Sequence, residues 1–431
     1  MNVSIVILAA GLGTRMKSSK AKVLHKICNK SIIWHILKQA YKISNEVNVV
    51  LAYQKEIIEE EIKKYFPQTK IILQDINNFP GTAGALKNFK TDKEKTLILC
   101  GDMPLIKEES LKKLLNLKNN FNIAIFDAKK SNNYGKVIIE DNKITKIIEA
   151  KDASEKEKNI TLCNSGVYAI NSSLLFKILP QIKNNNNVKE YYLTDIVKLA
   201  NDLKEQILPI LVDENEFMGV NDKFELSQAQ NLMQYEIKKE LMQKGIVFHN
   251  PNSSFIDPDV LFEGECEIYE NVRIEGKSII KNSIIKSSSI IEDSNIINSS
   301  IGPLSHIRPK CEIIDSNIGN FVECKNAKLF SIKAGHLSYL GDCHIDEGTN
   351  IGCGCITCNY DGIKKSYTKI GKNVFVGSDT QFIAPVCIED DVIIAAGSCV
   401  DQNLNKGVLF INRAQKKIIK NYFYKKIGKK I

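Results

Sequence analysis

A six-residue repeat in the second half of the chain constrains the fold more than any other sequence feature. Apolar residues recur every six positions at Ile370, Val376, Phe382, Ile388, Ile394 and Val400. Four residues after the first five of these stand Val374, Thr380, Val386, Val392 and Ser398. Earlier turns continue the pattern at Ile284, Ile290 and Ile296, with Ser288, Ser294 and Ser300 at the same offset, and it resumes after a one-residue slip at Ile301, Ile307 and Ile313. Hexapeptide repetition is typical of a parallel β-helix, whose stacked turns share one continuous core.

The first half of the chain has a different sequence pattern, in which strand-like and helix-like segments alternate. Apolar runs typical of strands occur at 3–10, 47–53, 70–75, 96–102 and 121–128, and helix-like stretches at 32–43 and 55–66 lie between them. This alternation predicts a mostly parallel sheet covered by helices. Ligands of such sheets bind at the carboxyl ends of the strands.

The chain is long enough for more than one core, since 431 residues exceed what a single core usually supports. Residues 223–243 contain no glycine or proline and show helical spacing of apolar residues, which predicts a helix between domains. We therefore expect a first domain over 1–222, a linker helix over 223–244, and a β-helix domain over 245–431 that ends in a basic tail.

Two motifs follow predicted strands of the first domain. The loop GLGTR, residues 11–15, can approach phosphates closely, because its glycines leave backbone N–H groups accessible and Arg15 adds a planar cation. Lys22 follows it. Asp102, in the segment CGD, places a carboxylate where Mg²⁺ could bind together with substrate phosphates. Taken singly, the first motif could be an ordinary glycine turn and Asp102 an ordinary cap, but the pair favours a nucleotide site.

In the second domain, the histidine in KAGHLSYLGD and the cysteines of GCGCITC are the residues that could carry chemistry. The repeat is interrupted over 323–342 and 359–368, and we expect the coil to extrude loops there, with His336 in the first of them. Cys353, Cys355 and Cys358 suggest zinc, but no second pair lies at metal-site spacing. Small residues also suit the inward positions of a coil, so we favour packing.

Composition narrows the class of protein. A hydrophobic fraction of 43% with 25% charged residues is that of an ordinary globular protein, and no apolar run is long enough to span a bilayer. With scattered cysteines and no leader-like start, we expect a cytoplasmic protein without membrane insertion. The net charge of +9 fits anionic substrates, nucleic acid or a lysine-rich genome equally well. A nucleic-acid or membrane binder would depend on the tail KKIIKNYFYKKIGKKI alone, so we expect no nucleic-acid partner.

Distinctive segments along nearly the whole chain resemble one known family, the bacterial bifunctional N-acetylglucosamine-1-phosphate uridyltransferase / glucosamine-1-phosphate acetyltransferase. They are LAAGLGTRM, GDMPLI, IIEAKDA, EYYLTD, GVN, IRPK, ECKNAKL, KAGHLSYLGD, CNYDG and FVGSDTQFIAPV. The resemblance implies an α/β nucleotidyltransferase domain with a Rossmann-like mixed, mostly parallel sheet, and a left-handed parallel β-helix of hexapeptide repeats. It also implies a homotrimer that serves peptidoglycan and lipopolysaccharide synthesis.

For the first domain, the resemblance implies uridyl transfer from UTP to N-acetylglucosamine 1-phosphate, with pyrophosphate leaving. Arg15 and Lys22 would act on the phosphates, and Asp102 with Asn221 would bind Mg²⁺. Uracil would be read by Gln74, Gly81 and Thr82, and the sugar would be contacted by Gly135, Glu149, Asn164 and Thr194. The remaining nucleotide contacts would be Leu8, Ala9, Ala10, Gly11, Gly13, Thr14 and Gly101. Mg²⁺ and the cations would stabilise negative charge on the transferring and leaving groups.

For the second domain, the resemblance implies acetyl transfer from acetyl-CoA to glucosamine 1-phosphate. His336 would be the base, because a neutral imidazole can take a proton from an attacking amine, and Glu323 would orient it. The sugar phosphate would contact Arg308, Lys325, Tyr339, Asn350, Asn359 and Tyr360. Acetyl-CoA would contact Cys353, Ser378, Ala396 and Arg413.

Three departures from the family pattern bear on these assignments. Ala21 precedes Lys22 where the family usually has proline, DINNFP lengthens the stretch between Gln74 and Gly81, and Cys353 replaces alanine. The alternative is a single-activity sugar-nucleotide transferase with a purely structural coil. Arg308, Lys325 and His336 argue against it.

Overall fold

The computed structural model describes residues 2–116, 119–128, 134–186 and 188–428, and the chain forms two compact units. The first runs from Met1 to Met233 and the second from Gln234 to Ile431. The division falls within helix α7 (Lys223–Gln243). Each unit has a hydrophobic core of its own.

The first unit is built on one mixed sheet. Its strand order is β11-β7-β10-β6-β1-β4-β5, and the neighbours are parallel except where β10 pairs with β6 and β7. The hairpin β8–β9 joins the sheet through β10. The strands are β1 (Val3–Leu8), β4 (Val47–Leu51), β5 (Lys70–Leu73), β6 (Lys95–Cys100), β7 (Phe121–Asp127), β8 (Lys136–Glu140), β9 (Lys143–Ile148), β10 (Leu162–Asn171) and β11 (Ile207–Leu211), with a separate two-stranded ribbon, β2 (Lys26–Ile27) and β3 (Lys30–Ser31). The predicted α/β fold class is confirmed.

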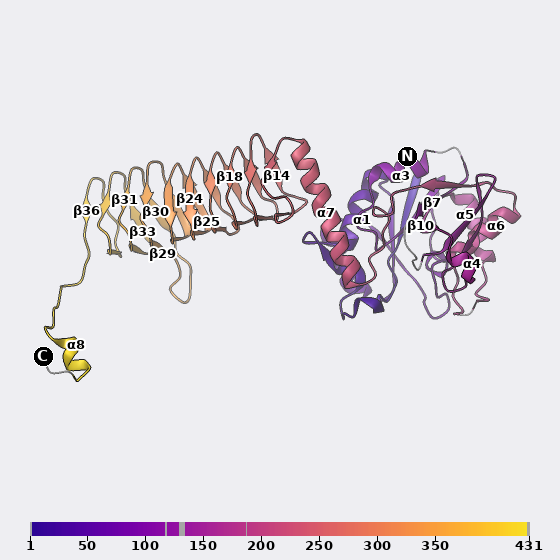
Figure 1. Ribbon diagram of the computed structural model, residues 1–431, viewed down its shortest axis with the longest axis horizontal. Helices are drawn as coiled ribbons and strands as arrows, with labels where there is room; N and C mark the ends of the chain where they lie inside the picture. The colour runs from indigo at the N-terminus through magenta and orange to yellow at the C-terminus, as the bar shows by residue number, and fades with distance from the viewer. Residues whose placement is uncertain (1, 117–118, 129–133, 187, 429–431) are drawn as a thin grey trace. The chain divides into compact units, whose positions relative to one another are not determined.

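Helices cover this sheet, which explains why its central strands are apolar on both faces. Every residue of β4 is buried, as are all but the last of β1. Among the helices, α1 packs with α3 and α5 packs with α6 (Figure 1). The helices are α1 (Ile32–Ile43), α2 (Lys55–Tyr65), α3 (Glu108–Leu115), α4 (Glu155–Lys158), α5 (Ser172–Ile178) and α6 (Ile196–Asp202), with 3-10 turns η1 (Thr14–Met16), η2 (Lys22–Leu24), η3 (Gly84–Leu86), η4 (Leu179–Gln181) and η5 (Leu193–Asp195).

The second unit is a coil of short parallel strands, drawn in Figure 1 as a series of rungs, and the predicted hexapeptide β-helix is confirmed. One face is the ten-stranded sheet β12 (Val247–Phe248), β15 (Glu267–Ile268), β18 (Ile284–Ile285), β21 (Ser300–Ile301), β24 (Asn317–Asn320), β26 (Lys333–His336), β28 (Asn350–Ile351), β31 (Phe375–Val376), β34 (Ile393–Ile394) and β36 (Leu409–Phe410). The other strands form two further rows, and β25 (Glu323–Phe330) and β27 (Tyr339–Ile345) each pair with both rows.

The two further rows form the second and third faces of the coil. The second face holds β13 (Phe255–Ile256), β16 (Arg273–Glu275), β19 (Ile290–Glu292), β22 (His306–Ile307), the first parts of β25 and β27, β29 (Ile356–Cys358), β32 (Gln381–Ile383) and β35 (Cys399–Val400). The third holds β14 (Leu261–Glu263), β17 (Ile279–Lys281), β20 (Asn295–Ile297), β23 (Glu312–Ile314), the later parts of β25 and β27, β30 (Thr368–Ile370) and β33 (Val386–Ile388).

In the early turns of the coil, the isoleucines that face the core are not all the ones that the six-residue spacing predicts. Ile285 and Ile291 are fully buried, whereas Ile284 is 37% exposed and Ile290 is half-buried, so the predicted positions 284 and 290 are wrong by one residue. Inward residues then follow at Ile296 and Ile301. A side of the coil can hold five residues as well as six, and adjacent isoleucines hide that change in the sequence.

Only one of the two predicted interruptions extrudes a loop. The stretch 323–342 is regular coil, because β25, β26 and most of β27 account for it, and the prediction of a loop there is wrong. Partners at one position of the first face, Ile301, Ile318, Ala334 and Ile351, are 17, 16 and 17 residues apart, but the next, Val376, is 25 residues on. The added residues form a loop over 359–366, closed by the hydrogen bond from Ser366 N to Asn359 O at 2.8 Å.

The coil's first turn is covered by the C-terminal part of α7. The Gln234 side chain donates to Ile256 O at 2.7 Å and accepts from Ile256 N at 3.0 Å, so it satisfies backbone groups that have no preceding turn to pair with. The Lys238 ammonium donates to Ser254 O at 2.8 Å. After the last turn, residues 411–428 are exposed and include the short helix α8 (Tyr422–Lys426). Across the described part of the chain, no helix has both the length and the apolar character to cross a membrane.

Candidate active sites

Parallel pairing of β1 with β6 sets the position of the first site. Leu8 lies opposite Cys100, so the segments that follow both strands leave the sheet at the same edge. Gly101 N donates to Leu8 O at 2.8 Å. A Cβ at Gly101 would lie 2.8 Å from the Ala9 Cβ, so only glycine allows this approach of the two chains.

Four predicted side chains meet at this edge. The Lys22 ammonium lies 2.5 Å from Asp102 Oδ2 and 3.1 Å from Asn221 Oδ1, and Arg15 Nη2 donates to the same Asn221 oxygen at 2.9 Å. Asn221 is 206 residues from Arg15 in the sequence. The oxygens of Asp102 and Asn221 thus converge on one cation, here an ammonium. Such hard oxygen donors suit a divalent metal ion.

The Asn221 side chain is held with its oxygen toward the cations. Its Nδ2 donates to Gly219 O at 3.2 Å, and its backbone N–H donates to Glu225 Oε2 at 2.6 Å. Gly219 N in turn donates to the Tyr134 hydroxyl at 3.2 Å, and burial raises the pKa of Tyr134 to about 12. Sequence reasoning missed Glu225 and Tyr134, although Glu225 stands one helical turn after the GVN segment.

The glycine-rich loop depends on Gly13. Its φ is 63°, in the left-handed region, and a Cβ there would lie 2.8 Å from the Lys22 Cβ. The loop can therefore lie against Lys22 only with glycine at this position. The other predicted members of this segment, Leu8, Ala9, Ala10, Gly11 and Thr14, lie at or just after the end of β1.

The predicted uracil contacts lie together next to β5. Gln74 Nε2 donates to Phe79 O and Gly81 O, both at 2.9 Å, which ties the residue to the C-terminal end of the lengthened segment. Gly81 has φ 93°, and its position against Tyr191 excludes a side chain. Thr82 Oγ1 accepts from Leu193 N at 3.0 Å.

The four predicted sugar contacts form two pairs. Thr194 Oγ1 donates to Glu149 Oε1 at 2.9 Å, and Asn164 N donates to Gly135 O at 2.8 Å. Asn164 Nδ2 also donates to the Tyr168 hydroxyl at 2.7 Å. Burial raises the pKa of Glu149, and the hydrogen bond from Thr194 opposes that rise in part.

In the second unit, cationic side chains gather on the second face of the coil. Arg308 Nη1 donates to Glu323 Oε1 at 2.9 Å. The pKa of Lys325 is lowered, chiefly by contact with the Lys365 amine and then by the positive charge of Arg308. Sequence reasoning missed Lys365, whose one signal was its place in the break over 359–368. Three cations so close together suit a doubly charged phosphate.

His336 ends β26 at the rim of a cavity of about 450 Å³ on the first face. The imidazole is exposed. Predicted contacts Asn350, Cys353 and Ser378 line the same cavity. Glu323 holds Arg308, and no hydrogen bond joins it to His336 among the described residues, so its expected orienting role has no support.

The remaining predicted residues lie on neighbouring turns. The Tyr339 ring lies against Gly341, where a Cβ would stand 2.4 Å from the phenol oxygen. Asn359 Nδ2 donates to that phenol oxygen at 3.4 Å. Tyr360 is 60% exposed and donates to Gly362 O at 2.7 Å. Further along, Arg413 Nε donates to Ala396 O at 2.8 Å, which brings these two predicted acetyl-CoA contacts together.

Each of the two units contains a stretch that matches a known protein family. Residues 5–162 match the MobA-like NTP transferase domain, and residues 367–402 match the bacterial transferase hexapeptide (six repeats). The chain is 63% identical to a bifunctional protein GlmU of Campylobacter jejuni and 62% identical to that of Campylobacter lari, each over 429 residues and 100% of both chains. Identity to the protein of the same name in Campylobacter concisus is 54% over 428 residues, 99% of this chain and 98% of that one.

The chain belongs to the bifunctional GlmU family. It is therefore an enzyme with both UDP-N-acetylglucosamine diphosphorylase and glucosamine-1-phosphate N-acetyltransferase activities. The single-activity alternative is not favoured. Membership in the GlmU family also implies use of acetyl-CoA, and of a divalent metal for nucleotidyl transfer.

The expected packing role holds for only part of the GCGCITC segment. Cys355 is buried in the coil with its thiol 3.4 Å from Gly377 O, and Cys358 is half-buried, but Cys353 is exposed, so packing is the wrong interpretation for Cys353. The described residues contain no group of three His, Cys, Asp or Glu side chains that could hold a metal ion.

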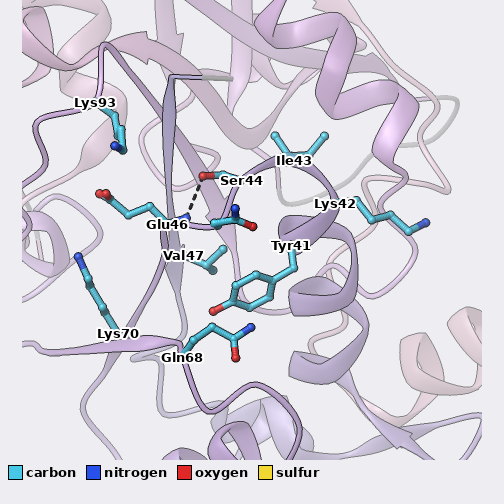
Figure 2. A pocket seen from close by; sticks show the side chains of 10 residues that line it. Tyr41, Lys42, Ile43, Ser44, Glu46, Val47, Gln68, Lys70 and Lys93 are labelled. Atoms are coloured by element: carbon cyan, nitrogen blue, oxygen red, sulfur yellow. Dashed lines mark hydrogen bonds between the residues drawn. The ribbon is translucent and has the colours of Figure 1, made fainter.

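A second cavity, of about 480 Å³, is lined by the end of α1 and the starts of β4 and β5 (Figure 2). These strand starts lie at the opposite edge of the sheet from Asp102, which follows the end of the parallel strand β6. In this cavity, the Glu46 carboxylate accepts a hydrogen bond from the Thr91 hydroxyl at 2.6 Å. Lys42 lies near Glu108, and Lys93 lies near Asp92.

The raised pKa of Glu149 gives a prediction about stability. Because the folded state holds this proton more tightly than the unfolded chain, stability is lost as pH rises through the folded pKa. Glu149→Gln removes the buried charge and can still accept from Thr194. We expect it to raise the free energy of unfolding of the first unit at pH 7 and to have little effect near pH 4. Urea unfolding at both pH values, beside exposed Glu140→Gln, measures this. A pH-independent difference would contradict the buried-charge explanation.

Proposed function

We propose that the cluster of Arg15, Lys22, Asp102 and Asn221 is the centre of uridyl transfer and that the metal is Mg²⁺. The convergence of the two oxygens on one ammonium is the observation that carries the proposal. Asp102 and Asn221 would hold the ion, which when bound neutralises negative charge on the UTP phosphates. Lys22 would then release its carboxylate partner and, together with Arg15, contact phosphate oxygens.

The rest of the site would position the two substrates for direct attack. Gln74, Gly81 and Thr82 would contact uracil, and Gln74 is already fixed by two hydrogen bonds that leave its side-chain oxygen available. Gly135, Glu149, Asn164 and Thr194 would contact the N-acetylglucosamine 1-phosphate. Its phosphate oxygen attacks the α-phosphorus of UTP, the bond to the β-phosphate breaks, and pyrophosphate leaves. No covalent enzyme intermediate is needed.

Asp102→Asn tests this site without changing the size of the side chain. It removes the charge that would bind the metal, so we expect uridyl transfer to fall by at least about 10²-fold. Acetyl transfer should stay at the wild-type level, because its site belongs to a different core. Exposed Asp92→Asn is the matched control. Both activities would be assayed over a range of Mg²⁺ concentrations, and an equal loss of the two in a folded protein would disprove separate sites.

We further propose that acetyl transfer takes place between the two faces that meet near His336. Arg308, Lys325 and Lys365 would bind the phosphate of glucosamine 1-phosphate, with Tyr339, Asn350, Asn359 and Tyr360 at the sugar. Cys353, Ser378, Ala396 and Arg413 would contact acetyl-CoA. The amine nitrogen attacks the thioester carbonyl, His336 takes the amine proton, and the C–S bond breaks to release CoA as its thiol once protonated. The product supplies the uridyl-transfer reaction.

His336→Ala should lower acetyl transfer by about 10²–10⁴-fold, the usual contribution of a positioned base. Uridyl transfer should not change. His306→Ala is a suitable control, since His306 lies on the same coil but pairs with Glu292 at 3.2 Å. Steady-state rates with glucosamine 1-phosphate decide the matter, and a wild-type rate in His336→Ala would make this histidine structural.

We also propose that the chain is a homotrimer in the cytoplasm, where UTP and acetyl-CoA are made. Flat coil faces and exposed apolar side chains support self-association. Phe375, Ile393 and Leu409 lie in register on neighbouring strands and are 52%, 51% and 61% exposed.

Ile393→Lys should dissociate such a trimer, because it places a charge within this apolar row. Acetyl transfer should fall with it, while uridyl transfer persists. Sedimentation of the full chain, with both activities followed on dilution, provides the measurement. A fully active monomer would exclude acetyl-transfer sites shared between copies.

A further inference from the structure

Asp342 is a buried carboxylate that no step above uses. It is 8% exposed and lies beside the proposed sugar contacts, on β27. Its Oδ1 accepts from Asn326 Nδ2 at 2.6 Å, and its Oδ2 accepts from Asn359 Nδ2 at 2.5 Å. The carboxylate thus lies between two side-chain amides, one of which belongs to the proposed site.

These contacts determine which way the Asn359 amide faces. An ionised carboxylate only accepts hydrogen bonds, so Asn359 must turn its NH₂ group toward Asp342. The second hydrogen of that group is directed to the Tyr339 hydroxyl at 3.4 Å. Both amide hydrogens are then in use, and among the described residues no donor reaches Asn359 Oδ1. The Asn359 side chain is left as an acceptor, while the Tyr339 hydroxyl keeps its own proton to donate.

The hydrogen bond from Asn359 to Asp342 also anchors the extruded loop over 359–366. Asn359 begins the loop, and its backbone oxygen accepts from Ser366 N at 2.8 Å where the loop returns. Between them, Tyr360 and Lys365 form an isolated antiparallel bridge. Lys365 extends from this loop to Lys325. The bond from Asn359 to Asp342 therefore ties the base of the loop, and with it Lys365, to the body of the coil.

We propose that Asp342 is a positioning residue for acetyl transfer: it fixes the Asn359 amide so that its oxygen accepts from an N–H or O–H of the amino sugar, and it holds the loop that carries Lys365. The proposal rests on the assignment of Asn359 and Lys365 to the glucosamine 1-phosphate site. Asp342 itself touches no reacting atom. Its effect should therefore fall on the sugar phosphate and leave acetyl-CoA binding unaffected.

Asp342→Gly is the first test, because glycine tolerates the φ of 48° at this position and removes the acceptor. Asn326→Gly is the matched control: it has φ 47°, and the variant deletes the other partner of Asp342 without touching Asn359. We expect Asp342→Gly to lower kcat/KM for glucosamine 1-phosphate by about tenfold or more, mainly through KM, as loss of a charged hydrogen bond predicts. The KM for acetyl-CoA and the uridyl-transfer rate should match wild type, as should all parameters of Asn326→Gly.

A reciprocal exchange covers the case in which Asp342→Gly folds poorly. Asn359→Asp alone places two carboxylates in contact and should lower kcat/KM at least about tenfold. In the double variant Asp342→Asn/Asn359→Asp, the new amide at 342 donates to the carboxylate at 359 and still accepts from Asn326. That pair restores both the anchor and an outward acceptor, so kcat/KM should return to within about threefold of wild type.

The outcomes separate this proposal from the assignment of the site. If Asn359→Ala leaves the KM for glucosamine 1-phosphate unchanged, the site assignment fails and the role of Asp342 fails with it. If Asn359→Ala is damaging but Asp342→Gly is silent, only the role of Asp342 is wrong. A double variant no more active than Asn359→Asp alone would likewise overturn it. Recovery in the double variant, with the change confined to the sugar phosphate, supports it.

Discussion

Parallel pairing of strands is the constraint on which both halves of this enzyme depend. Parallel neighbours end at the same edge, so whatever follows one strand lies beside whatever follows the next. In the first unit this brings the loop after β1 to the residues after β6, and Asp102 to Lys22. In the second unit the same rule repeats at every turn. Positions such as Glu323 and Tyr339 stack in register although they are 16 residues apart.

In the coil, this register places the candidate functional side chains outside the hydrophobic core. Inward positions are filled by apolar and small side chains, so a reactive group must lie on an outward strand position, at a corner, or on an inserted loop. His336 lies at a strand end, Arg308 and Lys325 on or beside outward strand positions, and Lys365 on the inserted loop. Asp342 does not follow this rule, because its carboxylate is buried beside the proposed sugar contacts. Two amide donors offset the cost of burying it.

Sequence patterns predicted the fold well because both units are built from short structural elements that recur at regular intervals along the chain. The six-residue spacing identified the coil, and the alternation of apolar runs with helices identified the mixed sheet. The frame at Ile284 and Ile290 was missed because each is followed by a second isoleucine, and an apolar pair does not reveal which member faces inward. His336 was expected in a loop because a change between five-residue and six-residue sides breaks the period in the sequence without breaking the coil.

The sites were predictable only where a motif carried them. Arg15, Lys22 and Asp102 stand in recognisable segments, and the structure brings them together with Asn221. Lys365 and Asp342 make contacts that depend on how far the loop over 359–366 projects and where it returns. No spacing in the sequence encodes that geometry. The orientation of the Asn359 amide follows from its two partners and from nothing in its own neighbourhood.

The two sites also differ in how their charges are balanced before substrates bind. In the first, Lys22 and Asp102 neutralise one another, so the proposed metal ion and UTP phosphates would have to exchange partners with groups that are already paired. Such an exchange would keep each of these partly buried charges compensated throughout. In the second, Lys325 lies close to Lys365 and Arg308, and the pKa of Lys325 is lowered first by contact with the Lys365 amine and then by repulsion from the charges of Arg308 and Lys365. On the proposed assignment, a phosphate dianion would relieve that repulsion when it binds, and the loop tied to Asp342 through Asn359 would hold one of the three cations in place until it does.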